Sequence, residues 1–190
     1  MNPIKSKGLK VTSYYGNRTY TYNGEKVSDF HHGIDLIPSP AIKDAEIVAF
    51  EDGVVTAVQK TGAQYGTGCY VRLKHANGLY TLYYHLKSGS IVVNKGESVK
   101  KGNKLGIIGA TGKATGVHLH FQIDKGSSST SINPYDYIFN NVDLIDGTII
   151  PDKVTKTNEE VAKEVIQGRW GNGNERKTKL IKAGYNYSVI

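Results

Sequence analysis

The chain has 190 residues, with 24 Lys and Arg against 17 Asp and Glu, so its formal net charge is +7. The basic residues are spread out, with a single Lys–Lys pair at Lys100–Lys101, which argues against a nucleic-acid-binding stripe and suits an extended polyanion. The single cysteine, Cys69, excludes a disulfide framework and a cysteine-pair zinc site, and no apolar stretch is long enough to cross a membrane.

Short strand-like segments follow one another through the first two thirds of the chain. Residues 46–58 predict two strands around a turn at Asp52–Gly53, and residues 69–75 and 79–86 predict a hairpin around Asn77–Gly78. Residues 91–99, 104–110 and 117–123 predict further strands, and His75 is expected to be a solvated hairpin residue. The pattern predicts a mainly β protein whose antiparallel unit spans residues 1–140.

The character of the sequence changes after this unit. Residues 141–156 read as a linker, and residues 157–190 as a small helical appendage. Its first helix is predicted from an N-cap at Thr157 and an apolar stripe of Val161, Ala162, Val165 and Ile166; a second is predicted over residues 174–183. Such a short appendage is too small to close a core alone.

Five of the 6 histidines lie in three short elements, together with one carboxylate. The elements are His31-His32-Gly33-Ile34-Asp35, Tyr84-His85-Leu86 and His118-Leu119-His120. Imidazole and carboxylate suit zinc, and three protein ligands with one open position are typical of a catalytic site.

Spacing gives a partial assignment of these residues. In a strand, His118 and His120 project from one face, so they could share a metal, or one could bind while the other handles protons. His31 and Asp35 keep the same parity in an extended segment and are predicted ligands, whereas His32 has the wrong parity and is predicted to be a neighbour. Spacing alone does not show that the elements converge.

These three elements resemble the M23 family of zinc metallopeptidases, of the lysostaphin and LytM type. The resemblance covers about residues 8–138 and includes Gly16-Asn17-Arg18, Asp52-Gly53-Val54-Val55 and the glycine-rich run before His118. It implies hydrolysis of peptide bonds in bacterial peptidoglycan by one zinc ion per chain. It also implies ligands at His31, Asp35 and His120, catalytic histidines at His85 and His118, and a tyrosine that stabilises the transition state, Tyr20 or Tyr22.

The chemistry of the implied roles is consistent. Zinc lowers the pKa of a bound water to about 7, and the chain has no Glu general base of the His-Glu-x-x-His kind. His118 is therefore predicted to take the proton from the attacking water, and His85 to orient that water or stabilise the oxyanion.

Residues 160–173 and 183–187 resemble the CW_7 (Cpl-7-type) cell-wall-binding repeat of phage lysins. The resemblance implies a partial helical repeat that contacts peptidoglycan. Arg169 and Trp170 are candidates for that contact, and packing between two short helices is the alternative role.

Together these resemblances predict a phage endolysin: a monomeric zinc endopeptidase that cleaves a cross-bridge or stem peptide. No signal-peptide core follows Met1, so we expect the protein in the host cytoplasm until lysis and then at the cell wall, without membrane insertion or nucleic-acid binding. The alternatives are a catalytically inactive M23-like module that binds peptidoglycan or activates another hydrolase, and a phage tail-associated wall hydrolase.

Overall fold

The structure is a computed structural model that describes residues 2–22, 24–62, 66–126, 130–140, 142–145, 158–167, 172–173, 176–177 and 180. It divides into two compact units, Met1–Pro134 and Tyr135–Ile190. In the described part of the chain, no helix is long and apolar enough to span a membrane.

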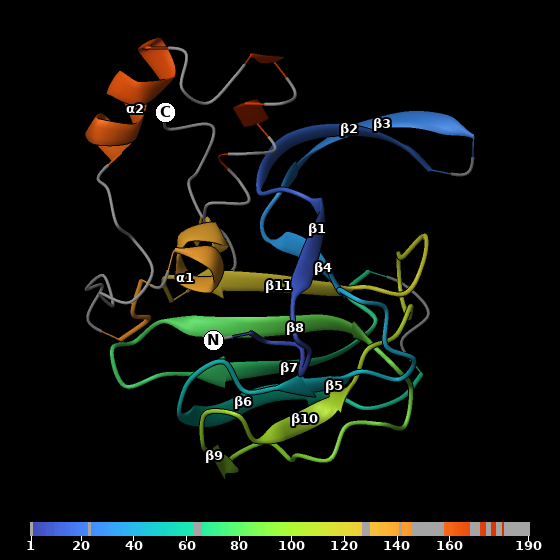
Figure 1. The fold of residues 1–190 in the computed structure, drawn as a ribbon. Helices are drawn as coiled ribbons and strands as arrows, with labels where there is room; N and C mark the ends of the chain where they lie inside the picture. Colours follow the sequence, from blue (N-terminus) through green and yellow to red (C-terminus); the bar gives the residue numbers. More distant parts are fainter. Residues whose placement is uncertain are drawn as a thin grey trace. The chain divides into compact units, whose positions relative to one another are not determined.

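The first unit is built from antiparallel strands, as the sequence predicts (Figure 1). The largest sheet has eight strands in the order β1-β4-β11-β8-β7-β6-β9, and β12 pairs with β11. Its strands are β1 (Leu9–Ser13), β4 (Ile34–Pro38), β6 (Gly53–Gln59), β7 (Cys69–Lys74), β8 (Tyr80–Leu86), β9 (Ser98–Val99), β11 (Leu119–Asp124) and β12 (Ser131–Ile132). Two small sheets pair β5 (Glu46–Val48) with β10 (Lys104–Ile107) and β2 (Gly16–Tyr22) with β3 (Glu25–His31).

Strand β11 lies inside the large sheet, where it pairs with β4, β8 and β12. All six of its residues are buried. Leu119, Phe121 and Ile123 alternate with His120, Gln122 and Asp124, so one face of the strand is apolar and the other is polar. Buried polar groups need partners, and the polar face of this strand is where the candidate site begins.

The predicted strands are present, with three differences in detail. The hairpin of residues 69–75 and 79–86 is confirmed by the pairing of β7 with β8. Residues 46–58 do contain two strands, but β5 pairs with β10 and β6 pairs with β7 and β9, so they form no hairpin. Residues 91–99 form only the two-residue strand β9. In the second unit, the short helix α1 (Tyr135–Phe139) was not predicted.

In the second unit, α2 spans Asn158–Ile166. Val161 is fully buried, but Ile166 is 86% exposed, so the predicted apolar stripe is wrong at its end. Five residues advance an α-helix by about 140° beyond whole turns, which takes Ile166 off the face of Val161. Within the second predicted helix, residues 174–183, the structure describes residues 176, 177 and 180, and these are helical; Thr157, Arg169 and Trp170 lie outside the described residues.

The prediction that His75 is solvated is wrong: its side chain is 3% exposed. Nδ1 donates to the Asp52 carbonyl at 2.7 Å, and Nε2 lies 2.8 Å from the Thr81 hydroxyl, which hydrogen-bonds with Tyr83. The Asn-Gly turn places His75 next to the core, and the hydrogen bonds satisfy both ring nitrogens. Burial lowers the pKa of His75 below its ordinary value.

This burial predicts a loss of stability in acid. As the pH falls below about 6.5, His75 of the unfolded chain takes up a proton before the folded protein does, so folding becomes less favourable. The wild type should lose stability more steeply than His75→Gln between pH 7.5 and 5, with an extra slope of at most about 1.4 kcal/mol per pH unit. Urea unfolding at several pH values measures this difference, and parallel curves for the two proteins would contradict it.

Candidate metal and catalytic site

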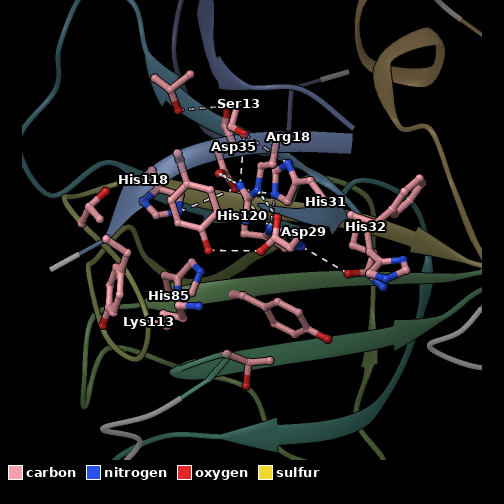
Figure 2. A pocket seen from close by; sticks show the side chains of 18 of the residues that line it. Ser13, Arg18, Asp29, His31, His32, Asp35, His85, Lys113, His118 and His120 are labelled. Carbon is pink, nitrogen blue, oxygen red and sulfur yellow. Dashed lines mark hydrogen bonds and ion pairs between the residues drawn. The ribbon is translucent and has the colours of Figure 1, made fainter. Parts of the chain in front are cut away.

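The three predicted metal ligands converge in the first unit, although they come from three strands. His31 ends β3, Asp35 lies in β4, and His120 lies opposite Asp35 in β11. His31 Nε2 and His120 Nδ1 are 2.9 Å apart, and each lies 3.1 Å from Asp35 Oδ1 (Figure 2). The chain turns at residues 32–33, between β3 and β4, and this turn brings His31 to Asp35. The two residues do not lie in one extended strand, so the prediction that they share a strand face is wrong, although they do meet.

The turn requires a glycine because it passes directly against His120. A Cβ on Gly33 would lie 2.5 Å from the Phe121 carbonyl oxygen and 2.7 Å from His120 Nε2. Any larger residue would therefore push the His120 ring or the β11 backbone away. The glycine of the His-His-Gly-Ile-Asp element thus has a packing role in the site.

Carbonyl oxygens fix the tautomers of both candidate histidine ligands. His31 Nδ1 donates to the Tyr14 carbonyl at 2.8 Å, and His120 Nε2 donates to Gln122 Oε1 at 3.2 Å. In each neutral ring the other nitrogen therefore carries a lone pair, and these are the two nitrogens that face each other and Asp35. Two imidazole lone pairs and a carboxylate oxygen within 4.8 Å of one another form a donor set that fits a cation such as zinc.

Asp35 remains ionised in this buried position. Burial opposes its ionisation, but the hydrogen bonds and positive charge that the His120 and His31 rings supply when they carry a proton on the nitrogen facing Asp35 outweigh burial and hold the pKa of Asp35 far below its ordinary value. In the neutral rings, a bound cation would take the place of those protons. Its second oxygen, Oδ2, accepts from Arg18 at 3.3 Å. Arg18 also donates to Asp29 at 2.8 Å, so one guanidinium from β2 ties β3 and β4 together at the site.

A chain of hydrogen bonds through Gln122 and Asp124 holds the His120 ring on its Nε2 side. Gln122 Nε2 donates to Asp124 Oδ1 at 2.7 Å, which turns Gln122 Oε1 toward His120. Burial raises the pKa of the Asp124 carboxyl, and the Tyr84 ring stacks on His120 with centroids 5.2 Å apart. The plane and the tautomer of this ring are therefore fixed before any metal binds.

The two other histidines stand together beside this group. The ring centroids of His85 and His118 are 4.8 Å apart, and His118 Nε2 lies 3.6 Å from Asp35 Oδ1. His118 Nδ1 donates to the Gly116 carbonyl at 2.9 Å, and His85 Nδ1 donates to the Thr111 carbonyl at 2.8 Å. When neutral, both rings thus carry their lone pair on Nε2, the form that a proton acceptor needs.

The backbone at His85 is irregular. Its φ is +64°, a left-handed value, and the register between β7 and β8 shifts at this point, where Val71 faces Tyr83 and Cys69 faces Leu86. Such a bulge re-aims a side chain out of the regular strand alternation. It explains why Tyr84 and His85, adjacent in one strand, both reach the same site.

Residues 29–134 match Peptidase family M23, and residues 159–190 match the CW_7 repeat. The chain belongs to peptidase family M23. Over 124 residues it is 42% identical to peptidoglycan DD-endopeptidase ShyA of Vibrio cholerae, covering 64% of this chain and 26% of that protein. It therefore spans about a quarter of that relative's length.

Solved structures share the fold of the M23 domain. The catalytic domain of the prophage-encoded M23 protein EnpA from Enterococcus faecalis is 32% identical, with a TM-score of 0.55, covering 70% of this chain and 93% of that one. The lysostaphin catalytic domain from Staphylococcus simulans is 28% identical, with a TM-score of 0.57 and coverage of 68% and 92%. A zinc-containing peptidase from Vibrio cholerae is 31% identical, with a TM-score of 0.50 and coverage of 65% and 35%.

A cleft of about 580 Å³ opens over the M23 site. Its lining includes both candidate tyrosines, and Tyr20 donates to Asp29 Oδ2 at 3.1 Å. His32 also lines the cleft, but its Nδ1 bonds the Ser131 hydroxyl at 2.8 Å, and it is not in the ligand group. The sequence did not predict site roles for Arg18, Gln122, Asp124 or Thr111, because these roles depend on side-chain contacts that form only in the folded protein.

The burial of the His85 ring predicts its charge state. Burial, followed by the neighbouring His118, lowers the pKa of His85 to about 4. A bound cation would favour the neutral ring still more. In the zinc-loaded M23 domain, long-range ¹H–¹⁵N spectra at pH 6 should show a neutral His85 ring protonated on Nδ1, and an imidazolium signal at that pH would contradict this prediction.

Proposed function

We propose that this M23 domain is a zinc-dependent endopeptidase that hydrolyses peptide bonds in bacterial peptidoglycan. The observation that carries the proposal is the division of the four histidines by tautomer. His31 and His120 turn lone pairs toward Asp35, while His85 and His118 keep unprotonated Nε2 atoms beside that group. Metal binding and proton transfer would therefore be carried out by different histidines.

In the proposed mechanism, His31, Asp35 and His120 hold the ion. Bound zinc would supply a water of pKa about 7 and polarise the scissile carbonyl. His118 Nε2 takes a proton from the attacking water and later gives it to the leaving amine. His85 accepts a hydrogen bond at Nε2 and orients that water, because a ring with a pKa of about 4 holds no second proton to donate to an oxyanion.

The test is digestion of several purified peptidoglycan types, with the released fragments identified by mass spectrometry. The proposal expects one zinc per chain by elemental analysis, loss of release after chelation, and recovery when zinc is added back. Release that survives complete chelation would refute the zinc mechanism. A protein that holds zinc but releases no fragment from any wall type would favour the alternative, a non-catalytic wall-binding or hydrolase-activating module.

We further propose that the protein is a monomeric phage endolysin, held in the host cytoplasm until lysis and then acting on the cell wall. Support comes from the match of residues 159–190 to the CW_7 repeat and from the likeness to a prophage-encoded M23 protein. The repeat, with Arg169 and Trp170, would keep the enzyme on the wall. Detection of the protein in lysing cells and its absence from purified virions would support the endolysin, whereas its presence in virions would favour a tail-associated hydrolase.

A further inference from the structure

Lys113 lies in the short segment that leads into His118, and its side chain lines the same cleft. Its backbone N–H donates to the Gly66 carbonyl at 2.8 Å, and the next residue, Ala114, donates to Gly112 at 3.0 Å. The Lys113 backbone is therefore held in place by hydrogen bonds, and Figure 2 shows the residue among the side chains of the cleft.

The ammonium group lies against two aromatic rings of another wall of the cleft. Lys113 Nζ is 5.0 Å from the ring centroid of Tyr22 and 5.9 Å from that of Tyr20. These tyrosines are two residues apart in β2, so they present their rings on one face of the β2–β3 hairpin. Contact with the rings limits where the charge can move without neutralising it.

Among the described residues, the ammonium group of Lys113 has no carboxylate partner in the cleft. Among the described residues that line the cleft, the carboxylates are Asp29 and Asp35, and both bind Arg18. Asp29 also accepts from Tyr20, and Asp35 contacts the histidine ligands. No ion pair joins Lys113 to a carboxylate in the part of the chain that the structure describes, although exposed lysines elsewhere, such as Lys87 and Lys104, have such partners.

We propose that Lys113 is a specificity residue that binds a free carboxylate of the substrate peptide near the scissile amide. This inference rests on the proposed function, and it deepens it by naming a substrate class: acidic stem peptides rather than uncharged glycine bridges. An ammonium ion forms charge-assisted hydrogen bonds to a carboxylate that an amide cannot match. Because Lys113 and His118 belong to one short segment of one cleft, the bound carboxylate would hold the peptide across the catalytic histidines.

Stem peptides offer this carboxylate at more than one position, so the experiment uses matched cross-linked peptide dimers. One dimer has every carboxylate free. Three others each carry one carboxamide: at the side-chain carboxylate of a diaminodicarboxylic acid, at the α-carboxylate of the γ-linked glutamate, or at the C-terminus. The zinc-loaded full chain is assayed with each dimer, and the amidation that lowers kcat/KM identifies the carboxylate that Lys113 binds.

For the exposed ammonium we expect one amidation to lower wild-type kcat/KM roughly three- to tenfold, mainly through KM, and less at high salt. Lys113→Met should lose most of this preference, and Lys113→Arg should keep it. Lys95→Met removes one exposed charge outside the cleft and should behave as the wild type does. Equal cleavage of all dimers by the wild type, or an unchanged preference in Lys113→Met, would overturn the inference.

Calorimetry with the same dimers separates this inference from the proposed function. If no dimer is cleaved but the wild type binds the free-carboxylate dimer more tightly than Lys113→Met does, the proposed enzyme fails and the carboxylate site stands. If the dimers are cleaved but both proteins bind and cleave them without preference, the enzyme stands and the carboxylate site fails.

Discussion

His118→Ala is expected to lower kcat by about 10²–10⁴-fold while the protein still binds one zinc per chain. The reason is that His118 lies outside the ligand group but beside it, with Nε2 3.6 Å from Asp35 Oδ1 and its proton committed to the Gly116 carbonyl. The loss should fall on kcat more than on KM, because proton transfer matters only in the transition state. Elemental analysis and steady-state kinetics on a defined wall fragment measure the two quantities.

His32→Ala is the matched control for this experiment. His32 lines the same cleft, but its ring bonds Ser131 and does not enter the ligand group. Its removal should leave both zinc content and kcat within a factor of a few. If His118→Ala turned over at nearly the wild-type rate with zinc bound, His118 would not be the general base, and His85 would become the candidate.

Gln122→Leu is expected to weaken zinc binding by about 10–100-fold. Leucine cannot accept the Nε2 proton of His120, so the ring loses the hydrogen bond at 3.2 Å that holds Nδ1 as the unprotonated nitrogen facing His31 and Asp35. Leucine has a similar size, and the position is buried, so the fold should survive the change. Competition with a coloured chelator gives the affinity, and thermal unfolding of the metal-free protein shows whether the fold is intact.

Gln122→Glu separates the positioning role from packing. A carboxylate at this position can still accept from His120, and Asp124, whose pKa is raised by burial, can share a proton with it. Gln122→Glu should therefore keep most of the zinc affinity that Gln122→Leu loses. Equal zinc affinity in the leucine variant and the wild type would show that the chain from Asp124 to His120 does not position the ligand.

Much of the fold was readable from local sequence. Alternation of apolar and polar residues and the Asn77–Gly78 turn predicted the β7–β8 hairpin, because hairpin partners are adjacent in the chain. The pairing of β5 with β10 could not be read in this way. Those strands are more than fifty residues apart, and strand partners at that separation are chosen by core packing, which leaves no local signal.

The types and grouping of the reactive residues can be read from local motifs: five histidines and one aspartate lie in three short segments that suit zinc and resemble family M23. The role of each ring nitrogen depends on contacts that form only when the chain folds. Those assignments depend on carbonyl oxygens of Tyr14, Gln122, Thr111 and Gly116, each of which accepts one proton from one ring. A histidine's tautomer is set by the neighbour that takes its N–H, and two of these neighbours, Tyr14 and Thr111, come from distant parts of the chain.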